Sequence, residues 1–170
     1  MRQSLYWDDF LHRAEETVDC IKNNQQIPVR RVAVFVTQKC NLSCAYCNSV
    51  NRPLEMSQSV FENIVHKYGK SAIIHLTGGE PSTVEWLYPY LESHKDEARF
   101  HLNTNAIITP PYKAVKRLKV SLDSCNAEYW DELVGRKGSF DKVVENIKKS
   151  IPHTVVSITF TMTHENYRTI

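Results

Sequence analysis

Three cysteines stand close together in the segment TQKCNLSCAYCNSVN, where Cys40, Cys44 and Cys47 have the spacing C-x-x-x-C-x-x-C. Thiolates favour soft metals, which narrows the choice to zinc or an iron-sulfur cluster. Structural zinc normally takes four protein ligands in two separated pairs, so a zinc module would need a distant histidine as its fourth ligand. A four-iron cluster held by three cysteines leaves one iron open to a small molecule. The spacing therefore predicts a reactive iron-sulfur centre, with structural zinc as the alternative.

The overall composition is that of an ordinary globular domain, with 170 residues, 42% hydrophobic and 24% charged. A net charge of +2 is too small to indicate a nucleic-acid partner or an anionic membrane surface. Acidic residues interrupt the apolar pairs near the N-terminus, so no signal peptide or membrane span is expected. Five cysteines in such a chain indicate metal or redox chemistry in the cytoplasm rather than a disulfide framework.

The N-terminal part of the chain predicts one helix, because apolar residues recur at helical spacing over residues 3–22. We expect residues 1–28 to form a helical extension and residues 29–170 to form the main domain. The segment RRVAVFVT is a β-branched apolar run, which predicts a strand buried on both faces and ending at Thr37. The cysteines then lie on the loop that follows this strand.

Strands and helices alternate along the rest of the chain. Four further strands are predicted in SAIIHLT, RFHLN, LKVSLD and TVVSITFTM. One helix is predicted to begin after Ser57 or Ser59, and a second to run from about Leu87 or Tyr88 to about Lys95. A third is predicted to begin at Ser139 as its N-cap residue. This alternation predicts the α/β class, with a parallel sheet connected by right-handed crossovers.

The unusual polar segments all follow predicted strands. The cysteines follow the first strand, TGGEP the second, NTNA the third, and SLDS closes the fourth. The carboxyl ends of parallel strands meet at one edge of the sheet, where such proteins bind ligands. We therefore expect these four segments to build one site.

The segments TQKCNLSCAYC, LTGGEP, LNTNA and VSLDS resemble the radical S-adenosylmethionine (SAM) superfamily, over about residues 30–170. Within it, the chain is most similar to the branch that contains the molybdenum cofactor cyclisation enzyme, and peptide-modifying, SPASM-like members share much of the pattern. The resemblance implies a partial parallel barrel of the (βα)6 TIM-like type, of which about five βα units are present here.

The resemblance also implies a cofactor arrangement and a reaction. Cys40, Cys44 and Cys47 would bind three irons of a 4Fe-4S cluster, and SAM would chelate the fourth iron through its amino and carboxylate groups. One electron from a flavodoxin or ferredoxin type donor would cleave SAM to methionine and a 5′-deoxyadenosyl radical, which abstracts hydrogen from a substrate. The substrate class, a peptide or a small molecule, is left open.

Family likeness and chemical fit together assign SAM contacts. Gly78 and Gly79 would let the backbone approach the methionyl group, and Glu80 would accept a hydrogen bond from its ammonium. Pro81 stiffens this turn, and the backbone of Tyr46 matches an adenine contact. The full set of predicted SAM-binding residues is Tyr46, Gly78, Gly79, Glu80, Pro81, Thr104, Asn105, Ser121 and Asp123.

Two features depart from the family pattern. Ala106 stands where the family usually has glycine, so the backbone after the third strand is expected to differ. A sixth strand is missing, which predicts either a longer protein or a partner chain that covers the open barrel edge. A catalytically silent scaffold that keeps the cluster and SAM sites is therefore an alternative to an active enzyme.

Three more residues lie near the predicted site. Cys125 is interpreted either as a buried, inert thiol or as a radical relay or second ligand. His75 and His101 are interpreted as hydrogen-bonded interior residues, with substrate contact as the alternative.

Overall fold

The computed structural model describes residues 2–49 and 51–168, and the chain separates into two compact units, with Arg31 beginning the second. The first unit contains the predicted helix, α1 (Arg2–Lys22). The Arg30 guanidinium lies 2.7 Å from the Glu16 carboxylate and donates to the Arg13 carbonyl, so the end of this unit folds back on its own helix. The division into an extension and a core domain at residue 28 stays a prediction.

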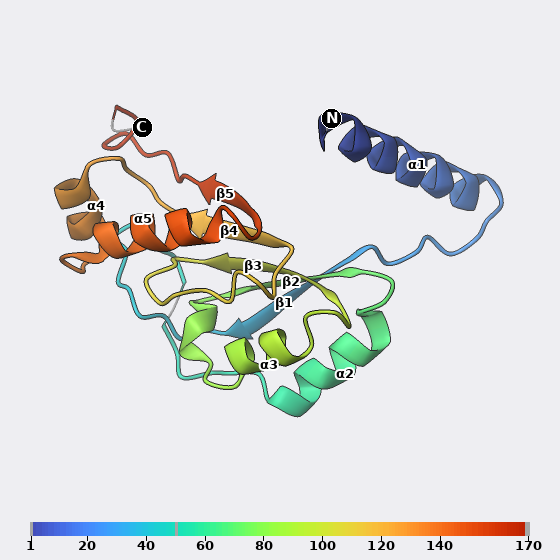
Figure 1. The fold of residues 1–170 in the computed structure, drawn as a ribbon, viewed down its shortest axis with the longest axis horizontal. Helices are drawn as coiled ribbons and strands as arrows, with labels where there is room; N and C mark the ends of the chain where they lie inside the picture. Colours follow the sequence, from blue (N-terminus) through green and yellow to red (C-terminus); the bar gives the residue numbers. More distant parts are fainter. Residues whose placement is uncertain (1, 50, 169–170) are drawn as a thin grey trace. The chain divides into compact units, whose positions relative to one another are not determined.

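The second unit is a five-stranded parallel sheet in the order β1-β2-β3-β4-β5 (Figure 1). The predicted α/β class and parallel sheet are confirmed. A short helix, Ala127–Leu133, and a 3-10 turn, Pro81–Thr83, were not predicted, and the last strand, Val155–Thr159, is shorter than predicted. The elements are β1 (Arg31–Thr37), α2 (Gln58–Tyr68), β2 (Ile73–Gly78), η1 (Pro81–Thr83), α3 (Leu87–Ser93), β3 (Arg99–Thr104), β4 (Arg117–Ser121), α4 (Ala127–Leu133), α5 (Ser139–Ser150) and β5 (Val155–Thr159).

Within the second unit, the helices pack against one face of the sheet. Leu76 of β2 and Phe100 of β3 are fully buried in one core with Phe61 of α2 and Val143 of α5. On β1, in contrast, Phe35 is 70% exposed. The prediction that β1 is buried on both faces is therefore wrong, because alternate residues of a strand face opposite sides and the helices of the second unit cover one side only.

The helix caps combine local and distant side chains. Ser57 caps α2 as predicted. Ser139 was predicted to cap α5, but the N-cap residue is Gly138, in the left-handed region at φ 73°. The Asp131 carboxylate of α4 accepts hydrogen bonds from three backbone N–H groups there, those of Gly138, Ser139 and Phe140. A charged acceptor at the positive end of the helix replaces the predicted hydroxyl.

None of the helices in the described residues has the length and apolar character that a membrane span requires.

Candidate functional site

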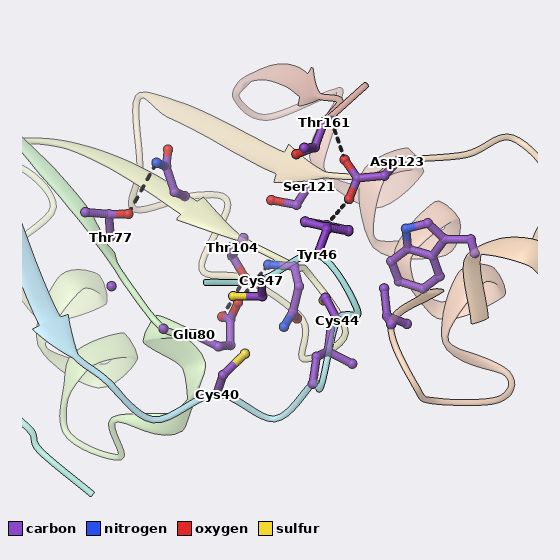
Figure 2. A pocket seen from close by; sticks show the side chains of 17 residues that line it. Cys40, Cys44, Tyr46, Cys47, Thr77, Glu80, Thr104, Ser121, Asp123 and Thr161 are labelled. Carbon is purple, nitrogen blue, oxygen red and sulfur yellow. Dashed lines mark hydrogen bonds between the residues drawn. The ribbon is translucent and has the colours of Figure 1, made fainter. Parts of the chain in front are cut away.

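A cavity of about 240 Å³ lies where the carboxyl ends of the strands meet (Figure 2). All three clustered cysteines line it, together with every predicted SAM-binding residue except Pro81. Pro81 lies just outside, as the first residue of η1. Residues that the sequence did not point to also line the cavity, namely Leu42, Thr77, Asn103, Trp130, Val134 and Thr161. The sequence signal for Thr77 and Asn103 was their place at strand ends, whereas Trp130 and Val134 depend on the unpredicted helix α4.

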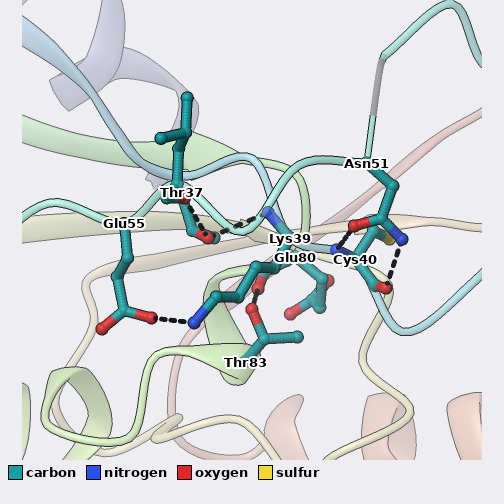
Figure 3. Close-up of polar contacts among 8 residues, drawn as sticks. Thr37, Lys39, Cys40, Asn51, Glu55, Glu80 and Thr83 are labelled. Carbon is teal, nitrogen blue, oxygen red and sulfur yellow. Dashed lines mark hydrogen bonds and ion pairs between the residues drawn. The ribbon is translucent and has the colours of Figure 1, made fainter.

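Two side-chain contacts hold the start of the loop that carries the cysteines, residues 38–49 (Figure 3). Asn51 brackets the Cys40 backbone, accepting from its N–H at 3.2 Å and donating to its carbonyl at 3.1 Å. Lys39 pairs with Glu55 at 3.0 Å. These contacts fix the first cysteine relative to the end of β1.

The middle of the cysteine loop is fastened to α4. The N–H of Ser43 donates to the Val134 carbonyl at 3.2 Å, and that of Ala45 donates to the Leu133 carbonyl at 3.0 Å. Cys44 lies between these two anchors, so its backbone position depends on a helix about ninety residues later in the chain.

The Gly-Gly-Glu segment is bonded to the same loop. The N–H of Gly79 donates to the Thr37 carbonyl at 2.8 Å, and the N–H of Glu80 donates to the Lys39 carbonyl at 2.7 Å. A Cβ on Gly78 would lie 2.3 Å from the Thr37 carbonyl oxygen, and one on Gly79 would lie 2.1 Å from that of Lys39. Both positions therefore need glycine because the cysteine loop packs directly against them. From the sequence, the reason for glycine here was the close approach of a ligand.

Glu80 is 1% exposed, and its carboxylate collects donors from two strand ends. It accepts from the N–H of Ser82 at 3.0 Å, from the Thr104 hydroxyl at 2.7 Å and from the N–H of Asn105 at 2.7 Å. Burial raises the pKa of Glu80, and these hydrogen bonds oppose that shift. Asn105 in turn donates to the Asn41 side chain at 2.7 Å, which ties the segment after β3 to the cysteine loop.

Asp123 is 2% exposed and connects three segments of the chain. Its carboxylate accepts from the Tyr46 hydroxyl and from the N–H of Thr161, the latter at 2.6 Å. Burial, together with the bond to Asp123, raises the pKa of Tyr46, so this hydroxyl stays protonated and acts as the donor. Asp123 was predicted to contact SAM, and in the structure both of its oxygens already serve neighbouring protein groups.

The residue after Asn105 is Ala106, where the resemblance implied a glycine. Ala106 is fully buried and lies in the left-handed region at φ 55°. Its N–H donates to the Thr104 hydroxyl at 2.9 Å, and its carbonyl accepts from Asn146 at 2.8 Å. An alanine in this conformation costs about 1–2 kcal/mol, which these two bonds help to offset. Ala106 thus adopts a backbone conformation that glycine takes more readily, and the expected difference from the family's backbone stays a prediction.

The donor set fits a soft, polynuclear metal group. Burial raises the pKa of Cys40, and burial with the neighbouring thiols raises the pKa of Cys44 to about 11, so a metal group must displace their protons on binding. Among the described residues, no three metal-ligating side chains close on a point suited to one ion. The indole Nε1 of Trp130 is buried without a hydrogen-bond partner in the described part of the chain. A ligand with an acceptor for this N–H suits this wall of the cavity.

The remaining candidates lie away from the cysteines. Cys125 is exposed and does not line the cavity, so the expectation of a buried thiol is wrong; it lies just before α4, beyond the end of β4. His75 is half-buried and its Nε2 lies 2.9 Å from the Asn103 side-chain oxygen, as expected for a hydrogen-bonded interior residue. His101 lies beside it, with the two rings 6.2 Å apart.

Comparisons with known proteins agree with this geometry. The family model described as "Radical SAM superfamily" matches residues 34–170. A "Probable GTP 3',8-cyclase" of Methanococcus maripaludis is 31% identical over 138 residues, which cover 72% of this chain and 46% of that protein. Another of Methanopyrus kandleri is 26% identical over 155 residues, covering 84% of this chain and 50% of that protein. The chain thus spans about half the length of these curated relatives.

Solved structures share the fold at lower sequence identity. SuiB of Streptococcus suis aligns with a TM-score of 0.70 and 18% identity, covering 95% of this chain and 40% of that one. The structure named anSMEcpe, solved with bound AdoMet and a peptide, aligns with a TM-score of 0.62 and 19% identity, covering 77% and 42%. Radical SAM proteins use a 4Fe-4S cluster and SAM, the two cofactors that the resemblance implied. Because the family model matches residues 34–170, which are most of this chain, the chain belongs to the radical SAM superfamily.

Proposed function

We propose that the chain is the core of a radical SAM enzyme, in which Cys40, Cys44 and Cys47 hold the 4Fe-4S cluster. When bound, the cluster and SAM supply a 5′-deoxyadenosyl radical that abstracts hydrogen from the substrate. The observation that carries the proposal is the convergence of the three thiols with the segments after β2, β3 and β4 on one cavity. No other cavity described for this chain combines three thiols with a buried carboxylate.

The residues of the chain have distinct parts in this proposal. The three thiols bind the cluster, and the Asn51 bracket orients the first of them. Glu80 orients the ammonium end of SAM from the Gly-Gly-Glu turn, and Trp130 offers its unpaired indole N–H. Leu42, Val134 and the Trp130 ring form an apolar wall that keeps water from the reacting groups.

The partners and the location belong to the same proposal. We propose a peptide or small-molecule substrate, supported by relatives named as GTP cyclases and by a SuiB structure bound to its precursor peptide SuiA. A flavodoxin or ferredoxin type protein would deliver the electron, and a partner chain or a further segment would cover an edge strand of the sheet, β1 or β5. Thiolate ligation of a cluster favours a reducing compartment, so we propose the cytoplasm.

The test is the reaction of the anaerobically reconstituted protein with SAM and dithionite. We expect release of 5′-deoxyadenosine, together with four irons and four sulfides per chain. Cys44→Ala removes one ligand and should abolish the nucleoside product, whereas Cys20→Ala, outside the second unit, should leave it unchanged.

Three results would oppose the proposal. An intact cluster whose EPR spectrum responds to SAM, without nucleoside release, would indicate the silent scaffold instead. A cluster that does not respond to SAM would contradict SAM binding. One zinc per chain with no inorganic sulfide would establish the zinc module.

A further inference from the structure

A second cavity of about 240 Å³ opens on the face of the sheet that the helices of the second unit do not cover. Three cationic side chains line it, those of Arg31 on β1 and of Arg117 and Lys119 on β4, and two histidines, His75 and His101, lie between them. We call this cavity the cationic pocket. The proposed cofactor site uses none of these five side chains.

The parallel register brings these side chains together. His75, His101 and Arg117 are direct partners across β2, β3 and β4, so they form one row on the same face. Two residues further on, Lys119 is paired with Asn103. Because alternate residues of a strand share a face, both rows point away from the helices. The concentration of charge is therefore a result of sheet order, since the residues are far apart in sequence.

The cationic pocket has positive charge without compensation. Its lining contains no aspartate or glutamate. Among the side chains that the structure describes, those of residues 11–49 and 51–168, no carboxylate lies at ion-pair distance from Arg31, Arg117 or Lys119. Like charges gathered on a concave surface repel one another and raise the local positive potential. An anion bound among them would relieve that repulsion.

The neutral groups of the pocket are also suited to an anion. Burial, with the nearby cations, lowers the pKa of His75 and lowers that of His101 to about 4, so both rings are neutral at pH 7. The one N–H of His75 is already donated to the Asn103 side-chain oxygen, so His101 is the ring that can donate an N–H to an anion. The Ser157 hydroxyl is buried and has no hydrogen-bond partner among the described residues. A bound oxyanion would supply the missing acceptor.

Position links the cationic pocket to the proposed radical site. Asn103 lines both cavities, and its side chain also joins His75 to Thr77. A molecule that binds in the cationic pocket can therefore extend past Asn103 toward the cysteines. This is the arrangement expected for a substrate held by one end and reacting at the other.

We propose that the cationic pocket binds a phosphate group of the substrate, so that the enzyme acts on a phosphorylated small molecule. This inference rests on the proposed function for the reaction itself. A single carboxylate would offset one of three positive charges, whereas a phosphate or polyphosphate offsets two or more. Two guanidinium groups also present paired N–H donors that match the oxygens of phosphate.

The test is isothermal titration calorimetry on the reconstituted protein, with inorganic tripolyphosphate and the dicarboxylate glutarate as probes. We expect tripolyphosphate to bind at least about tenfold more tightly than glutarate, with affinity that falls as salt is added. The double variant Arg117→Gln with Lys119→Gln should weaken tripolyphosphate binding by at least about tenfold. Lys119→Arg, which keeps the charge, should bind within about threefold of the natural chain.

The matched control is Lys148→Gln, which removes an exposed positive charge from α5, outside the pocket, and should change the affinity less than about twofold. Thermal melts of all variants establish that they are folded. Equal affinity in the double variant and the natural chain, no binding of tripolyphosphate, or tighter binding of glutarate would each overturn the inference. The last result would point to a carboxylate-bearing substrate such as an acidic peptide.

Failure of this inference and failure of the proposed function give different results. A cluster that responds to SAM in EPR, together with no tripolyphosphate binding, removes only the phosphate pocket. Tripolyphosphate binding that depends on Arg117 and Lys119, together with no nucleoside product, removes the radical reaction and leaves the pocket.

Discussion

The hydroxyl of Tyr46 donates a hydrogen bond to the buried carboxylate of Asp123, which lies 77 residues later in the chain. The same carboxylate accepts from the N–H of Thr161, so one acid joins the cysteine loop, the end of β4 and the segment after β5. Both side chains line the cavity with the three cysteines. The position of the cysteine loop over the sheet therefore depends on a side-chain contact far from the cysteines in sequence.

Tyr46→Phe removes this hydroxyl and leaves a buried carboxylate with one bond fewer. We expect the free energy of unfolding to fall by about 1–3 kcal/mol in urea titrations, with the three thiols still able to bind iron. Tyr129→Phe is the control, because the Tyr129 hydroxyl makes no hydrogen bond to the described residues. An equal loss in both variants would show that the contact to Asp123 contributes nothing.

Gly79→Ala would place a Cβ 2.1 Å from the Lys39 carbonyl oxygen, a contact that forces the backbone to move. The Gly-Gly-Glu segment must then separate from the cysteine loop, and we expect a loss of more than about 3 kcal/mol in unfolding free energy and of most bound iron. Gly138 has a positive φ, unlike Gly79, but a Cβ added there would meet nothing within 4 Å. The control Gly138→Ala should cost about 1–2 kcal/mol and keep its iron. Iron content that stays at the natural level in Gly79→Ala would contradict the packing argument.

Glu80→Gln exchanges one carboxylate oxygen for an amide group that donates. Three donors converge on Glu80, so one of them would face another donor in the variant. We expect a loss of about 2–4 kcal/mol in chemical denaturation and a weaker EPR response to SAM. Glu85→Gln changes an exposed acid close by and should stay within about 0.5 kcal/mol. If the two variants are equally stable, the three hydrogen bonds of Glu80 do not hold the strand ends together.

His101 should make the stability of the protein depend on pH. Burial, with the nearby cations, lowers its pKa in the folded chain from 6.5 to about 4. Below pH 6.5 the unfolded chain therefore binds a proton that the folded chain does not, and the free energy of unfolding falls as the pH is lowered from about 7 to about 4. His101→Gln stays neutral and should lose less stability over this range.

The measurement is the urea midpoint at pH 7, 6 and 5 for the natural chain and for His101→Gln. The exposed His66→Gln variant serves as the control and should follow the natural chain. Parallel curves for the natural chain and His101→Gln would contradict a lowered pKa for this histidine.

Local sequence patterns were sufficient for the architecture and for most of the pocket lining. Alternating apolar runs and turn residues predicted five parallel strands, and the segments at their carboxyl ends were predicted to meet. The cysteine trio and the residues after β2, β3 and β4 do line one cavity, apart from Pro81. These predictions succeed because strand periodicity, capping and the order of strands follow from short-range interactions and simple topology.

The tertiary structure decided what each of these residues contacts. The carbonyls of Thr37 and Lys39 explain the two glycines, and α4 brings Trp130 to the cavity, none of which is written in a local pattern. The cationic pocket likewise exists only because sheet register places residues of β1 and β4 beside two histidines. The sequence by itself determined which residue types stand at the strand ends. Only the fold decided their partners, because hydrogen bonds and charge repulsion depend on distances between residues that are far apart along the chain.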